Sequence, residues 1–156
     1  MLLGVLNQKG GVGKTTTTVN LGAALAKKEK KVLLVDIDAQ SNLTAHLGLT
    51  PREDGDNPVD SGQIPEFTIY DVLKGQKRLE EVIIHRSENL DVVPSSLLLS
   101  AADLEFGGVV GRELLLKRVL DKPKSQYDFV VIDCPPALGL LTLNVLAAVE
   151  KVIIPV

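Results

Sequence analysis

Short runs of consecutive apolar residues alternate along the chain with longer segments in which apolar residues recur at helical spacing. An unbroken apolar run is typical of a strand that is covered on both faces, whereas recurrence every three to four residues indicates an amphipathic helix. The runs predict strands at residues 2–6, 32–35, 90–93, 129–132 and 152–154. The helical patterns lie at about residues 14–28, 42–47, 68–73, 79–83, 100–105, 111–120 and 142–148.

Strands that alternate with helices predict an α/β fold, with a mostly parallel sheet and helices on both of its faces. We expect a single domain over residues 1–156, because a chain of this length can bury roughly 70% of its unfolded surface. Residues 50–65 contain three prolines, two glycines and four acids without apolar periodicity. This segment is predicted to be a surface loop and not a domain boundary.

The composition excludes several classes of protein. The single cysteine, Cys134, cannot form an internal disulfide or a four-ligand zinc site. An aromatic content of 3% argues against a stacking platform for single-stranded nucleic acid. The first apolar run is too short for a secretory signal, and no run approaches the roughly 20 residues of a membrane span. We therefore expect a cytoplasmic protein without a membrane partner.

Charge is distributed unevenly, although the net charge is only -3. Six lysines and one acid, Glu29, lie in residues 1–31, whereas seven acids and one arginine, Arg52, lie in residues 36–66. Such a division can mark a polyanion-binding patch. Four of the lysines follow the apolar run of residues 21–26, however, where cations complement the carboxyl end of a helix. A solvated helix end is the favoured interpretation.

The segment after the first predicted strand carries the strongest chemical signal. Its glycines allow backbone N–H groups to close around a phosphate chain, and the helix that follows presents its positive end. Lys14 can reach the outer phosphates, and the Thr15 hydroxyl is suited to Mg²⁺. The expected nucleotide-binding residues are Lys9, Gly10, Gly11, Val12, Gly13, Lys14, Thr15 and Thr16. The general phosphate-loop pattern has glycine at position 8, where this chain has Gln8.

Three acids follow predicted strands. Asp36 and Asp38 are two residues apart on an extended chain, so both carboxylates can approach one metal ion or water at the carboxyl end of a strand. They could instead be a helix cap and a surface charge. Asp133 ends the run of residues 129–132. A buried acid needs a cation or hydrogen-bond donors, and Mg²⁺ held through water beside Thr15 would meet that need, with a structural strand-end cap as the alternative.

Residues 9–16, Lys-Gly-Gly-Val-Gly-Lys-Thr-Thr, resemble the deviant Walker A motif of the MinD/ParA group of P-loop ATPases. The preceding Asn7-Gln8 is similar to the ParA (Soj) branch, and the resemblance extends over residues 35–42, 68–75, 90–96, 127–136 and 140–144. It implies ATP and Mg²⁺ as cofactors and an ATP-dependent homodimer. Lys9 would reach the partner's nucleotide, Lys14 the bound phosphates, and Asp38 would orient or activate the attacking water.

The resemblance further implies that Asp36 supports the magnesium shell together with Thr15, Asp38 and Asp133. Ala39 stands where the ParA branch has proline, which predicts a looser turn. The implied fold is the N-terminal portion of a P-loop NTPase, truncated at the C-terminus.

The implied function is a switch that hydrolyses Mg-ATP to drive segregation of chromosomal or plasmid DNA, with a ParB-like stimulating partner and non-specific DNA. The usual DNA-binding region lies beyond this chain by resemblance. One alternative is a MinD-like division-site ATPase, which needs an amphipathic membrane helix. The other is a nucleotide-binding or interaction module without turnover.

Overall fold

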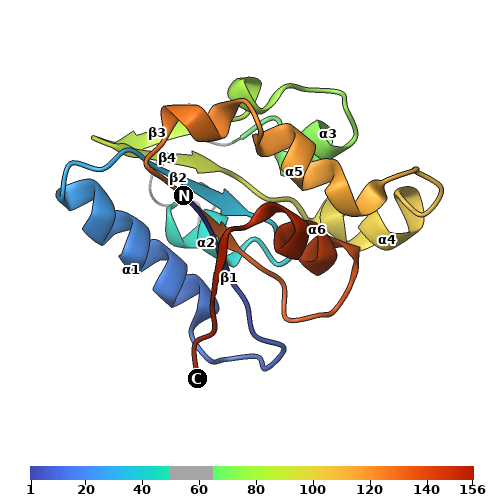
Figure 1. Ribbon diagram of the computed structural model, residues 1–156, viewed down its shortest axis with the longest axis horizontal. Coiled ribbons are helices and arrows are strands. Elements are labelled where there is room, and N and C mark those ends of the chain that lie inside the picture. Colours follow the sequence, from blue (N-terminus) through green and yellow to red (C-terminus); the bar gives the residue numbers. More distant parts are fainter. Residues whose placement is uncertain (50–64) are drawn as a thin grey trace, which may run out of the picture.

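The computed structural model describes residues 1–49 and 65–156, and a six-stranded sheet forms its centre in the order β3-β4-β2-β5-β1-β6 (Figure 1). The strands are β1 (Leu2–Val5), β2 (Val32–Asp36), β3 (Ile84–Ser87), β4 (Leu90–Val93), β5 (Phe129–Asp133) and β6 (Lys151–Ile153). All neighbours pair in parallel except β3, which runs antiparallel to β4. The mostly parallel α/β sheet is therefore confirmed.

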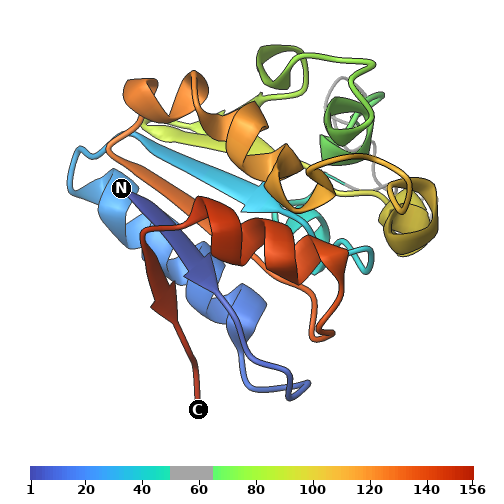
Figure 2. The same cartoon turned by 45° about the vertical axis from the view of Figure 1, so that its right-hand side comes forward.

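One strand was missed by the sequence pattern. Strand β3 is an edge strand whose residues are half-buried or exposed. Its sequence therefore has no apolar run from which a strand could be predicted. The opposite edge is β6, which lies beside β1 and runs in the same direction (Figure 2). The structure places β6 one residue earlier than the predicted range of 152–154.

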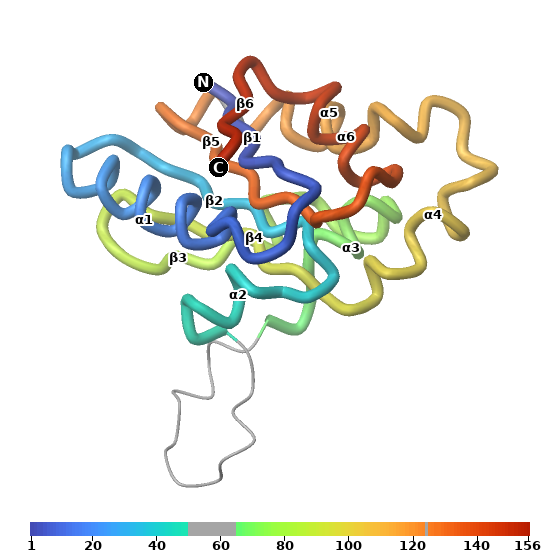
Figure 3. The backbone as a smooth tube through the Cα atoms, turned by 90° about the horizontal axis from the view of Figure 1, so that it is seen from below, coloured from blue at the N-terminus to red at the C-terminus, as the bar shows by residue number. Residues whose placement is uncertain are grey.

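Helices cover both faces of the sheet. The α-helices are α1 (Lys14–Lys27), α2 (Asn42–His46), α3 (Ile69–Leu73), α4 (Ala102–Glu105), α5 (Leu115–Leu120) and α6 (Leu140–Ala148). Short 3-10 turns are η1 (Leu79–Glu81), η2 (Leu97–Ala101), η3 (Arg112–Leu114) and η4 (Pro123–Gln126). Helices α1 and α2 lie on one side, with α5 and α6 on the other (Figure 3).

Two hydrophobic clusters, one on each side of the sheet, form the core. In β2, Leu33 and Val35 belong to the cluster that contains α3, α5 and α6, whereas Val32 and Leu34 belong to the cluster beneath α1 and α2. All four side chains are fully buried. Because successive side chains of a strand point to opposite faces, a strand covered on both sides must be apolar throughout. The unbroken apolar run is explained by this packing.

Helix α1 lies very close to β2. An ideal Cβ on Gly22 would stand only 2.6 Å from Cδ2 of the fully buried Leu34, so a larger residue would force the helix away from the sheet. The helix begins at Lys14, directly after the glycine-rich segment. The close packing at Gly22 holds α1 against β2.

Two predicted helices differ in detail between pattern and structure. The pattern at residues 79–83 forms only the three-residue turn η1, and the pattern at 111–120 forms η3 followed directly by α5. Gly111, with a positive φ of 69°, precedes both and is the N-cap residue of η3. The helical segment therefore begins only after this glycine, since a left-handed residue cannot lie within a right-handed helix.

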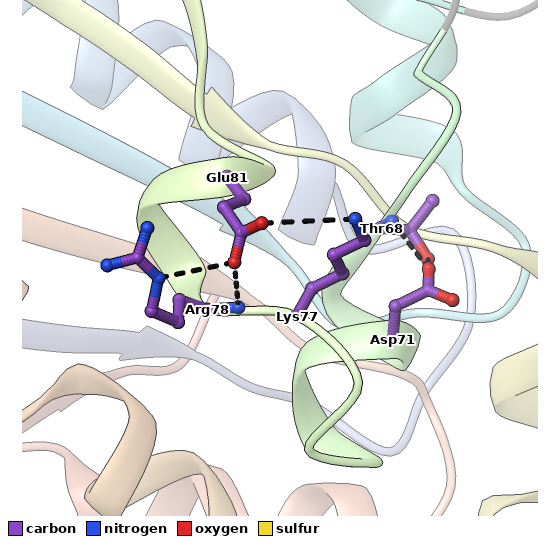
Figure 4. Close-up of polar contacts among 5 residues, drawn as sticks. All are labelled: Thr68, Asp71, Lys77, Arg78 and Glu81. Atoms are coloured by element: carbon purple, nitrogen blue, oxygen red, sulfur yellow. Dashed lines mark hydrogen bonds and ion pairs between the residues drawn. The ribbon is translucent and has the colours of Figure 1, made fainter.

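The segment from α3 to η1 is held by local polar contacts. Asp71 accepts a hydrogen bond from the backbone N–H of Thr68, which forms a capping box at the start of α3 (Figure 4). Glu81 accepts from the backbone and Nε of Arg78 and pairs with Lys77. These contacts define the connection that leads into β3.

The loop expected at residues 50–65 lies, apart from Pro65, outside the described residues. Within 1–49 and 65–156, none of the helices has the length and apolar character needed to cross a membrane.

Candidate nucleotide site

The glycine-rich segment links the carboxyl end of β1 to the amino end of α1. Gly11 and Gly13 have φ values of +73° and +82°, in the left-handed region that favours glycine. An ideal Cβ on Gly10, Gly11 or Gly13 would meet no heavy atom within 4 Å. Gly11 and Gly13 are therefore required by backbone conformation and not by crowding, and the space beside all three glycines is open to a phosphate chain.

Asn7 anchors the start of this loop. Its Oδ1 accepts a hydrogen bond from the backbone N–H of Lys9 at 2.9 Å, and its Nδ2 donates to the carbonyl of Pro155 at 2.7 Å. The loop is thus tied to the segment that follows β6. Lys9 itself is exposed at the outer rim of the loop.

Lys14 lies across the loop as the first residue of α1. Its side chain is buried, and Nζ donates to the carbonyl oxygen of Lys9 at 3.3 Å. The first backbone N–H groups of a helix have no partner within the helix, so this end of α1 carries partial positive charge. The ammonium and the helix end together make an anion-binding environment.

Thr15 and Asp133 are in direct contact. The Thr15 hydroxyl donates to Asp133 Oδ2 at 2.6 Å, although the two residues are 118 positions apart in the sequence. Thr18, one turn further along α1, donates to Asp133 Oδ1 at 3.3 Å. Sequence analysis missed Thr18, whose signal was its helical spacing from Thr15. The structure therefore brings together Thr15 and Asp133, two of the four residues that the sequence assigned to magnesium.

Burial raises the pKa of Asp133 to about 6, against the opposing effect of hydrogen bonds from Thr15 and Thr18. The negative charge of Asp38 raises this pKa further, whereas the positive charge of Lys14 lowers it. An ionised carboxylate at this depth is costly without a cation. A divalent ion beside Asp133 would stabilise its charged form.

Asp36 and Asp38 have different surroundings. Asp36 is fully buried, and its Oδ2 accepts from the backbone N–H and the hydroxyl of Thr44 at 2.9 and 2.7 Å. Its Oδ1 accepts from the backbone N–H of Asp38 at 3.1 Å. Burial raises the pKa of Asp36 to about 7. Thr44 lies in the first turn of α2, whose N-cap residue is Ser41, so Asp36 ties the start of this helix to β2 without being its N-cap. A role for Asp36 in a magnesium shell stays a prediction.

Asp38 is buried, and its Oδ1 accepts from the backbone N–H of Gln40 at 3.0 Å. In the described part of the chain, no three acid, histidine or cysteine side chains are grouped so that they could hold a metal ion. Mg²⁺ keeps several waters and commonly uses one or two protein oxygens. The pair of Thr15 and Asp133 fits that requirement, with Asp38 nearby as a charged neighbour.

Comparison with known sequences identifies the family of the chain. A family model described as an AAA domain, AAA_31, matches residues 2–156. The chain belongs to this AAA domain family. It is 47% identical over 156 residues to another protein, the sporulation initiation inhibitor protein Soj of Bacillus subtilis, with 99% of this chain and 57% of Soj covered. The resemblance to the ParA and Soj branch is confirmed.

Solved structures agree with this assignment to the AAA domain family. Cobyrinic acid a,c-diamide synthase from Mycobacterium smegmatis, solved with bound ADP and magnesium, matches with a TM-score of 0.88 at 39% identity, covering 99% of this chain and 58% of that one. A plasmid partition protein from Borrelia burgdorferi matches with a TM-score of 0.87 at 32% identity, covering 99% and 64%. The chain thus spans little more than half the length of these proteins.

Proposed function

We propose that this chain binds Mg-ATP at residues 9–16 and hydrolyses it, as the ATPase part of a ParA-type switch. The contact between Thr15 and Asp133 is the observation that carries the proposal, because it joins two magnesium-type ligands at the mouth of a phosphate loop. The ADP and magnesium in the Mycobacterium smegmatis structure support the same ligands here.

Each residue of the site has a distinct part in this proposal. Backbone N–H groups of the loop and the ammonium of Lys14 bind the phosphates, and Thr15 and Asp133 hold the metal ion, Asp133 through water. The ion, when bound, neutralises charge on the transferring phosphoryl group. Asp38 orients the attacking water. Hydrolysis of this kind depends mainly on positioning and on electrostatic stabilisation.

The decisive test of nucleotide binding is Lys14→Ala, with Lys27→Ala as the matched control. Both variants remove one lysine from α1, but Lys27 is exposed at the opposite end of the helix. Loss of a charged hydrogen-bond donor should weaken Mg-ATP binding roughly 100-fold. Isothermal titration calorimetry measures both affinities, and equal affinities for the two variants would contradict the proposed site.

Lys9 is proposed to reach the nucleotide of a second copy of the chain. Its exposure at the loop rim supports this role. Lys9→Ala should bind Mg-ATP within about threefold of the unmodified chain, as expected for loss of a surface charge. It should also fail to dimerise when ATP is added. Light scattering after gel filtration detects the dimer, with the exposed Lys28→Ala as control, and an unchanged dimer in the Lys9 variant would refute the role in trans.

The cellular role proposed is segregation of chromosomal or plasmid DNA, in the cytoplasm and at the nucleoid when DNA is bound. The match to a plasmid partition protein supports it. The partners would be non-specific DNA and a ParB-like stimulating protein. ATP-dependent retardation of random-sequence DNA by this chain tests the DNA step, and no retardation at low salt would exclude it for this chain.

A further inference from the structure

A closed ring of hydrogen bonds surrounds the backbone of Asp38. Asp36 accepts from the N–H of Asp38 and from the hydroxyl of Thr44. Thr44 Oγ1 in turn accepts from the backbone N–H of Ser95 at 2.9 Å. The Ser95 hydroxyl then donates to the carbonyl oxygen of Asp38 at 2.5 Å, which closes the ring. The ring joins the end of β2, helix α2 and the residue pair that follows β4.

All four members of the ring are buried, with exposed fractions of 0% for Asp36, 6% for Asp38, 1% for Thr44 and 5% for Ser95. Among the described residues, every buried side-chain nitrogen and oxygen has a hydrogen-bond partner. Buried networks of this kind hold a single arrangement when every member is satisfied, because breaking one bond leaves a polar group unpaired. The ring is therefore a rigid support.

The ring determines where the Asp38 carboxylate lies. The N–H of Asp38 is held by Asp36, and its carbonyl is held both by Ser95 and by the N–H of Ser41 at 2.9 Å. Because both the N–H and the carbonyl of Asp38 are held, the point from which its side chain extends is fixed. Its Oδ1 also accepts from the backbone N–H of Gln40. Ser95 is 57 positions away in sequence and supplies a contact that the segment of residues 36–44 cannot make for itself.

We propose that Ser95, acting with Thr44, is a positioning residue that holds Asp38 where it can orient the attacking water. This inference rests on the proposed function, because it assumes hydrolysis assisted by Asp38. Ser95 acts through the main chain of Asp38. A displacement of about 1 Å at such a group can reduce the rate roughly 100-fold. Ala39, beside Asp38, lacks the ring of a proline, and the hydroxyl of Ser95 supplies a restraint at the same turn.

The experiment compares steady-state ATP hydrolysis by the full chain and four variants. Ser95→Ala removes the hydroxyl, and Thr44→Val removes the other hydroxyl while keeping the side-chain shape. Thr44→Ser restores that hydroxyl. Ser96→Ala is the matched control, since Ser96 is the neighbouring serine but its hydroxyl only accepts from the N–H of Leu98 at the start of η2.

For Ser95→Ala and Thr44→Val we expect kcat to fall roughly tenfold or more, with KM for ATP within about twofold. Thr44→Ser should recover most of kcat, and Ser96→Ala should match the unmodified chain. Thermal melting should show every variant folded at the assay temperature. A merely structural role would lower the melting temperature and leave kcat unchanged, and that result for Ser95→Ala overturns the inference.

Asp38→Ala separates this failure from failure of the proposed function. If Asp38→Ala loses turnover but binds ATP while Ser95→Ala turns over normally, only the positioning role is wrong. If the unmodified chain does not hydrolyse ATP, or if Asp38→Ala hydrolyses it normally, the proposed function fails and the inference falls with it.

Discussion

Two regions at the carboxyl edge of the sheet differ in their burial and in their hydrogen bonding. The phosphate loop, residues 9–13, is largely exposed and rich in glycine, and open space surrounds its glycines. The carboxylate turn, residues 36–41, begins with buried acids and is held by hydrogen bonds from α2 and from Ser95. Groups that receive a ligand must keep their donors free for it. Groups that position a reactant must have their own hydrogen bonds made within the protein.

The phosphate loop and the carboxylate turn also differ in which residue types adopt a left-handed backbone conformation. The loop uses Gly11 and Gly13, whereas the turn places Ser41 at a φ of 52°. A residue with a Cβ is strained there by roughly 1–2 kcal/mol. The backbone N–H of Ser41 donates to the carbonyl of Asp38, so the strained residue closes the turn. The turn tolerates backbone strain because hydrogen bonds from α2 and Ser95 hold it in place. The loop has few such contacts and avoids the strain by using glycine.

The largest expected effect comes from truncating an apolar side chain in the helix that follows the turn, compared with one in the loop. Leu43 lies in α2, directly after the turn, and is fully buried, whereas Val12 in the loop is only partly buried. Leu43→Ala should lower the free energy of unfolding by about 3 kcal/mol, because it leaves a cavity. Val12→Ala should lower it by less than about 1 kcal/mol. Urea denaturation measures both, and equal losses would mean that the loop is packed as tightly as the helix that follows the turn.

A smaller effect distinguishes two glycines within the loop. Gly10 and Gly13 both have room for a Cβ, but only Gly13 has a positive φ. Gly13→Ala should therefore destabilise the chain by about 1–2 kcal/mol, while Gly10→Ala should change stability by less than about 0.5 kcal/mol. The same denaturation curves check this pair. If both variants lost equal stability, crowding and not backbone conformation would explain the glycines.

The smallest effect is expected for Ser41→Gly in the turn. Glycine removes the strain of the left-handed conformation but increases the freedom of the unfolded chain, so the two contributions largely cancel. We expect a change in unfolding free energy within about 0.5 kcal/mol, measured by urea denaturation. A loss above about 1.5 kcal/mol would show that the Ser41 side chain itself stabilises the turn.

Much of the site could be predicted from local sequence. The nucleotide-binding residues 9–16 could be predicted because they are consecutive and their residue types are suited to binding phosphate or Mg²⁺. Asp36 was harder, since its spacing from Asp38 suggested a shared ligand, but the structure directs its oxygens to Thr44 and to the backbone of Asp38. Thr44 and Ser95 have ordinary sequence contexts. Their importance arises from burial and from partners that local spacing does not reveal.

The sequence by itself determined the local elements: apolar runs for five strands, helical periodicity between them, and glycines at the positive-φ positions of the loop. Only the tertiary structure decided the strand order, the edge strand β3 and the meeting of Thr15 with Asp133 or of Ser95 with Asp38. Periodicity reports which side of an element is buried. It carries no information on which distant element covers that side, because that choice depends on packing between surfaces formed by separate parts of the chain.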